Sequence, residues 1–245
     1  PGGQIVSDNT VDGSDVRSVA GSFATIFGGY RTLIVEKVSQ TNGADDPLKT
    51  ADLTVSGGLL SFSTDSLVTG TAEIVWDGDN DATFVNTTDL IGSLIFQEGC
   101  AQSGCTEFVF DVLEADQGFD FEFDIFDTSG NSSNLVGISP QVSSAITFAV
   151  PFDVWLQPSG TTSAGGGINV GFDYEIQSTG TVDLNQVSAM VLRLNIATLK
   201  TGSLDVSIDS VAKQTPTPAT LALLAAGLVG IGAASGRRRR SNRQA

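Results

Sequence analysis

The strongest constraint on this fold is the stretch from residue 119 to residue 125, in which apolar and acidic side chains alternate without exception. A period of two is that of a β-strand, because successive side chains of a strand point to opposite faces of the sheet. One face of this strand is expected in a core and the other in solvent. The apolar positions are Phe119, Phe121, Phe123 and Ile125, and the acidic positions are Asp120, Glu122 and Asp124.

The same pattern returns in residues 168–176 and in residues 204–211, where it changes register at its end. Gly-Gly, Asn-Gly and Asp-Gly pairs separate many of the apolar stretches, as tight turns require. No long apolar pattern of helical period precedes residue 219, so the sequence predicts an all-β fold, an antiparallel β-sandwich. Residues 160–167 are rich in Gly, Ser and Thr and are expected in a loop. Shorter predicted strands are Thr32–Lys37, Leu59–Ser63, Ala72–Trp76, Thr106–Val112, Ala145–Val150 and Val187–Ile196.

The charge is distributed very unevenly along the 245 residues. Residues 1–214 hold 7 basic and 28 acidic side chains, a formal charge of −21, whereas residues 215–245 hold 5 arginines and no acid. Phosphate binding needs clustered cations, so the acidic part is not expected to bind nucleic acid. The sequence has no histidine, which excludes His-based triads and His metal sites.

The C-terminal thirty residues predict a membrane segment. Residues 219–236 carry no charge, and eighteen helical residues span about 27 Å, close to the thickness of a hydrocarbon core. The arginines Arg237, Arg238, Arg239 and Arg240 follow, and a cationic cluster marks the cytoplasmic side. The expected organisation is an extracellular β-sandwich (1–213), a Pro-rich linker (214–218), a transmembrane helix (219–236) and a basic cytoplasmic tail (237–245).

Residues 215–243 resemble the PEP-CTERM sorting signal of exosortase substrates. The resemblance lies in Pro216, Thr217, Pro218 and Ala219, in the short Leu/Ala/Gly helix, and in the terminal arginines; Thr217 stands where the family usually has Glu. It implies a bacterial protein that is exported and held transiently in the membrane, then cleaved near Pro216–Pro218 by an exosortase-like protease. The destination is then the cell surface or an exopolysaccharide matrix.

Two stretches of the body, Ser18–Lys37 and residues 203–211, are similar to jelly-roll domains of carbohydrate-binding-module type. That likeness concerns architecture and brings no binding residue. Aromatic rings can stack on sugars, and Trp155, which prolines flank near a loop, is the first candidate. Trp76 and Tyr174 fall in apolar strand registers and are expected in the core.

Two further features suggest sites. Hard oxygen ligands at alternating positions suit calcium, and the candidates are Asp77, Asp79, Asp81 and Asp89. This is no EF-hand loop, because Ala82 and Thr88 replace its Gly and its bidentate Glu. A second acidic loop holds Asp111, Glu114 and Asp116. Cys100 and Cys105 are expected to close a short disulfide loop, with a redox pair as the alternative.

The body has no nucleophile elbow, phosphate loop or dinucleotide fingerprint. With 28 acids, no catalytic carboxylate pair can be selected from the sequence. The expected function is therefore a non-enzymatic structural role at the bacterial surface. A polysaccharide-binding module, with or without calcium in its site, is the alternative, and a glycan-active enzyme is a third hypothesis.

Overall fold

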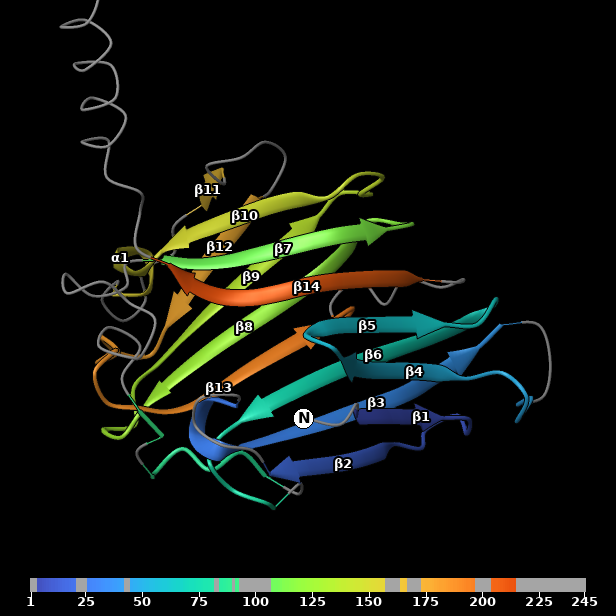
Figure 1. The fold of residues 1–245 in the computed structure, drawn as a ribbon, viewed down its shortest axis with the longest axis horizontal. Helices are drawn as coiled ribbons and strands as arrows, with labels where there is room; N and C mark the ends of the chain where they lie inside the picture. Colours follow the sequence, from blue (N-terminus) through green and yellow to red (C-terminus); the bar gives the residue numbers. More distant parts are fainter. Residues whose placement is uncertain are drawn as a thin grey trace, which may run out of the picture. The chain divides into compact units, whose positions relative to one another are not determined.

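Two antiparallel sheets form the body of the protein in the computed structural model (Figure 1). The structure describes residues 4–20, 26–41, 45–81, 84–89, 91–92, 107–156, 164–166, 173–196 and 204–214. The six-stranded sheet has the order β1 (Gln4–Asp8), β4 (Ala51–Ser56), β5 (Leu59–Thr64), β14 (Asp205–Gln214), β7 (Glu107–Ala115) and β10 (Ile146–Pro151).

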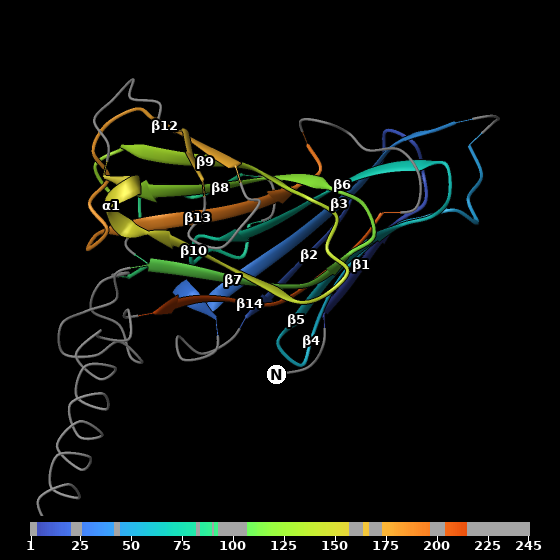
Figure 2. The same ribbon diagram turned by 90° about the horizontal axis from the view of Figure 1, so that it is seen from above.

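The eight-stranded sheet has the order β11 (Ala164–Gly166), β12 (Asp173–Ser178), β9 (Ser132–Ser139), β8 (Phe119–Asp127), β13 (Val187–Leu194), β6 (Val68–Trp76), β3 (Tyr30–Gln40) and β2 (Asp15–Ala20). A short helix, α1 (Phe152–Trp155), follows β10, and a 3-10 turn, η1 (Phe27–Gly29), precedes β3. Figure 2 shows the two sheets lying face to face as layers, which is the predicted sandwich.

Alternate residues of both sheets fill the space between the layers. From the eight-stranded sheet, Phe121 and Phe123 point inward, and from the six-stranded sheet Phe108 and Phe110 meet them. The rings of Phe108 and Phe123 pack edge to face with centroids 5.1 Å apart, a favourable aromatic geometry. The period of two in β8 therefore becomes a buried aromatic row at the centre of the core.

Most of the predicted strands are confirmed within one to four residues at their ends. The predicted register change in residues 204–211 is also confirmed, because the pairing of β14 with β7 shifts between Ser207 and Ser210. The Gly57-Gly58 pair forms the β4–β5 turn with φ of 63° and 95°, values that glycine adopts at little cost. The strands that the sequence pattern missed are β1, β2, β4, β9 and β11.

The region from residue 160 to residue 176 differs from its prediction in two places. Residues 160–167 were expected in a loop, but Ala164–Gly166 forms β11 and pairs with β12. The predicted strand 168–176 appears as β12 from Asp173 onward, and its first residues lie outside those that the structure describes.

The chain divides into two units, Pro1–Gln214 and Thr215–Ala245. The second unit lies outside the described residues, so the predicted membrane helix and basic tail stay predictions. Within the described residues, no helix combines the length and apolar character that crossing a membrane requires.

Candidate functional site

The candidate site lies on the outer face, by which we mean the face of the eight-stranded sheet that points away from the core. Register places its side chains in rows that cross the strands. In one row, Ile34 of β3 pairs with Glu73 of β6, Glu73 with Arg193 of β13, and Arg193 with Glu122 of β8. In the next row, Thr32 is opposite Val75. Neighbouring strands are about 4.8 Å apart, so four strands span about 15 Å.

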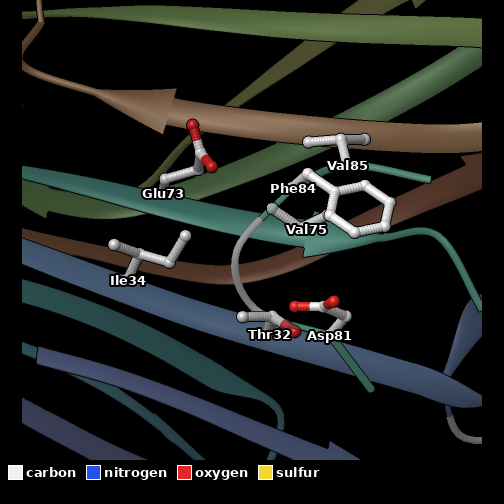
Figure 3. Close-up of a pocket in the computed structure, with 7 residues that line it drawn as sticks. All are labelled: Thr32, Ile34, Glu73, Val75, Asp81, Phe84 and Val85. Atoms are coloured by element: carbon white, nitrogen blue, oxygen red, sulfur yellow. The ribbon is translucent and has the colours of Figure 1, made fainter. Parts of the chain in front are cut away.

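A pocket of about 220 Å³, the outer-face pocket, lies over β3 and β6. Its floor is Thr32, Ile34, Glu73 and Val75, and its other lining comes from Asp81, Phe84 and Val85 in the segment that follows β6 (Figure 3). The ring of Phe84 lies beside Val75, and the carboxylate of Asp81 lies beside Thr32 (Figure 3).

Phe84 is a large apolar side chain with 60% of its surface exposed. Val75 below it is 4% exposed and Thr32 is 2% exposed, so the floor is covered while the aromatic ring remains accessible. An accessible ring above a concave floor with carboxylates at its side offers both an apolar surface and hydrogen-bond acceptors. This combination is typical of ligand sites.

Next to the pocket lies the Arg193 cluster, which consists of Arg193, Glu73, Glu122 and Asp124. Arg193 Nε donates to Glu73 Oε2 at 2.5 Å, and its Nη1 donates to Asp124. Glu122 Oε2 lies 4.0 Å from Nη1. Asn134 Nδ2 donates to Asp124 Oδ1 at 2.6 Å. Three carboxylates therefore lie around one guanidinium.

Two members of the cluster, Glu122 and Arg193, have shifted pKa values. Burial raises the pKa of Glu122 above its ordinary value, and the negative charge of Asp124 raises it further. Burial alone would lower the pKa of Arg193, but attraction to Glu73 and Asp124 outweighs burial and raises it. Arg193 thus stays charged, while Glu122 holds a proton more readily than an ordinary Glu.

The acidic face of β8 was expected in solvent, and this prediction is wrong. Asp120 is 1% exposed and Asp124 is 7% exposed. The alternation in β8 correctly separates the two faces, but it contains no information about Arg193, which lies on the neighbouring strand and draws the carboxylates together.

The prediction that Trp155 stacks on sugar is also wrong. Its side chain is 0% exposed, and its ring packs edge to face on Phe108 and Phe123 at centroid distances of 5.9 and 5.5 Å. The one-turn helix α1 turns the ring into the core. Trp76 and Tyr174 pack against the core as predicted.

The structure does not bring the four predicted calcium ligands together. Asp77 is 2% exposed, and its carboxylate accepts backbone hydrogen bonds from Asp79 at 3.1 Å and Asn86 at 2.9 Å. Asp89 instead accepts from the Asn86 side chain at 2.9 Å. Asp77 therefore organises the loop that carries Asp81 and Phe84. Among the described residues, no three acidic or cysteine side chains converge as a metal site would need.

The prediction of a second acidic loop is wrong for two of its three residues, because Asp111 and Glu114 lie in β7 and only Asp116 follows that strand. Two of the three carboxylates accept structural hydrogen bonds. Asp111 accepts from Thr147 Oγ1 across β7 and β10 at 2.6 Å, and Asp116 accepts from the Asp205 backbone at 2.8 Å. The remaining predicted site residues lie outside those that the structure describes: Cys100, Cys105, Pro216, Thr217, Pro218, Ala219, Arg237, Arg238, Arg239 and Arg240.

Sequence reasoning missed Phe84, Glu73 and Arg193. A weak signal was present for two of them. Arg193 is the single charged residue in a strand that is otherwise apolar or small, and Phe84 is an aromatic residue in a polar segment outside every strand pattern. Glu73 gave no signal, because only the register of β6 against β13 places it beside Arg193.

Comparison with known proteins gives distant structural likenesses. No family model and no curated protein matches the sequence. An exo-β-agarase has a TM-score of 0.38 and 13% identity over 87% of this chain and 24% of the agarase chain. A family 11 carbohydrate-binding module from Clostridium thermocellum, solved with a β-1,3-1,4-mixed-linked tetrasaccharide, has a TM-score of 0.33 and 13% identity, covering 85% of this chain and 96% of its own. The chain spans about a quarter of the agarase.

Proposed function

We propose that the body is a non-enzymatic polysaccharide-binding module of an exported bacterial surface or matrix protein. The observation that carries this proposal is the accessible ring of Phe84 above the outer-face pocket. A sugar ring has an apolar face that can lie on an aromatic ring, and hydroxyl groups at its edge that donate to carboxylates. The pocket has about the right size for one sugar of a longer chain, since sites for whole drug-sized ligands begin at about 300 Å³.

Native affinity electrophoresis tests the proposal. The full chain, in a non-ionic detergent without a sugar headgroup, is run through gels that contain bacterial exopolysaccharides, once with calcium and once with a chelator. Retardation by one polysaccharide is expected. If chelation abolishes the retardation, calcium takes part in binding. Unchanged mobility in every gel contradicts the proposal and leaves an acidic structural protein.

The variant Phe84→Ala assigns any binding to the pocket. Loss of an accessible aromatic contact is expected to weaken binding about tenfold, equivalent to about 1.4 kcal/mol. Leu48→Ala is the matched control, because Leu48 is 88% exposed and lies in the β3–β4 connection. Equal mobility of Phe84→Ala and Leu48→Ala in the retarding gel would show that the site lies elsewhere.

A glycan-active enzyme is the second candidate, and one observation favours it. Glu122 has a raised pKa and lies two residues from Asp124 on the same face, which resembles an acid and a carboxylate for glycoside cleavage. The ties of Asp124 to Arg193 and Asn134 favour binding over catalysis. Release of new reducing ends from the retarding polysaccharide, lost in Glu122→Gln, would support the enzyme.

The proposal for localisation rests on the sorting-signal resemblance. The full chain is expected to be exported, held in the membrane by residues 219–236, and cleaved near Pro216–Pro218. In a bacterium that has an exosortase, the released form should end near these prolines, and deletion of the exosortase should leave the intact chain in the membrane. Gln at all four of Arg237–Arg240 should also reduce release. The same intact product in all strains would contradict the proposal.

A further inference from the structure

The charge of the outer-face pocket points to a narrower class of ligand. Of the seven described residues that line the pocket, Glu73 and Asp81 are acidic and none is basic. Phe84 presents an aromatic ring at the same opening, and the face of such a ring attracts cations. Two carboxylates and an aromatic ring around one small pocket match the chemistry of an ammonium group.

The surroundings of the pocket have the same sign. Arg193 is the base that contacts Glu73 of the pocket, and its donors already point to Glu73 and Asp124. Glu122 lies 4.0 Å from Arg193, and Asp120 is buried on the same face of β8. The cluster therefore carries more negative charge than one guanidinium neutralises, and residues 1–214 carry a formal charge of −21. Uronic acids, sulfates and phosphates would be repelled here.

Resting on the proposed polysaccharide binding, we propose that the outer-face pocket binds an amino sugar with a free, protonated amine, in a polysaccharide whose hexosamines are not N-acetylated. The ammonium lies between the Asp81 and Glu73 carboxylates and the ring of Phe84. Acetylation removes the charge and adds a bulky amide, so an N-acetylated chain of the same length binds more weakly.

The test compares three hexasaccharides by calorimetry with the full chain: β-1,4-linked glucosamine, its fully N-acetylated form, and β-1,4-linked glucose. The glucosamine hexamer is expected to bind at least tenfold more tightly than the other two. Asp81→Asn and Phe84→Ala should each weaken that binding about fivefold to tenfold. Glu114→Gln is the matched control for charge, because Glu114 is an exposed acid on β7 of the other sheet.

The possible binding results separate the amine preference from polysaccharide binding itself. Equal or tighter binding of the acetylated or glucose hexamer would overturn the amine preference and leave polysaccharide binding in place. Glucosamine binding that Asp81→Asn and Phe84→Ala weaken no more than Glu114→Gln would show general attraction to an acidic protein, which also overturns the inference. Failure of all three hexamers, together with unchanged mobility in every polysaccharide gel, would overturn the proposed function itself.

Discussion

Lys37 and Arg193 are both cations in contact with carboxylates, but the ratio of positive to negative groups differs between their two environments. The side chain of Lys37 is 0% exposed, and its ammonium has three acceptors: Asp45 Oδ1 at 2.6 Å, the Asp46 carbonyl at 3.0 Å and the Asn9 carbonyl at 3.3 Å. An ammonium has three donors, so every donor is used. The side chain of Arg193 is 25% exposed, and its guanidinium faces three carboxylates.

The difference separates a structural cation from one in a candidate site. Lys37 joins the β1–β2 connection to the β3–β4 connection, and its hydrogen bond holds the pKa of the Asp45 carboxyl below its usual value. One carboxylate balances one ammonium there. Around Arg193 the carboxylates outnumber the single cation, and Glu73 of this cluster lines the outer-face pocket. We infer that excess negative charge beside a pocket is what a charged ligand can use, whereas a fully buried ammonium paired with one carboxylate stabilises loops.

Lys37→Met should have the largest effect on stability, because it keeps the apolar stem and removes the ammonium. The Asn9 and Asp46 carbonyls and the Asp45 carboxylate then lose their shared donor, at a cost of about 3 kcal/mol in the free energy of unfolding. Urea unfolding followed by tryptophan fluorescence measures it. Lys49→Met is the control, since Lys49 makes comparable bonds to Ser66 in solvent and should change stability by less than about 0.5 kcal/mol. Equal losses in the two variants would contradict a special role for Lys37.

Arg193→Met should cost less, about 2 kcal/mol, because Arg193 is partly exposed and water can solvate the carboxylates that remain. Repulsion among Glu73, Glu122 and Asp124 then dominates, so added salt should recover part of the loss. Urea unfolding at low and high salt gives both values. The exposed Arg17 provides the control, Arg17→Met. A variant as stable as the wild type at low salt would show that Arg193 does not hold the carboxylates together.

The comparison also shows how far the sequence determines the fold and the site. Alternation along β8 predicts its two faces, because burial on one face is a property of a single strand. The burial of Trp155 depends on the α1 turn, and the pairing of Glu73 with Arg193 depends on register between strands 120 residues apart. These relations arise from contacts distant in sequence. The outer-face pocket is formed jointly by one face of a sheet and by the segment after β6, so no local sequence pattern predicts it.

One of the strands that the pattern missed, β9, has a clear physical reason. In β9, the residues opposite β8 include Ser133, Asn134 and Gly137, so the apolar alternation is interrupted. The large aromatic row of β8 supplies the apolar area on this part of the sheet, and the partner strand can be polar. A strand can therefore be polar where the strand paired with it supplies the buried apolar side chains.

Glu122→Gln should have the smallest effect on the free energy of unfolding, and it should stabilise the protein rather than destabilise it. Because its folded pKa is raised by burial and by Asp124, the ionised Glu122 opposes folding at neutral pH. That unfavourable contribution is full above the raised pKa and disappears as the pH falls below the ordinary value of a Glu. The variant should therefore gain less than about 1 kcal/mol at pH 7 and nothing at pH 3, as measured by urea unfolding. Glu175→Gln, an exposed acid of β12, is the control. A loss of stability at pH 7 would mean that attraction to Arg193 outweighs burial, and that the Arg193 cluster lacks the excess negative charge which an amine ligand would use.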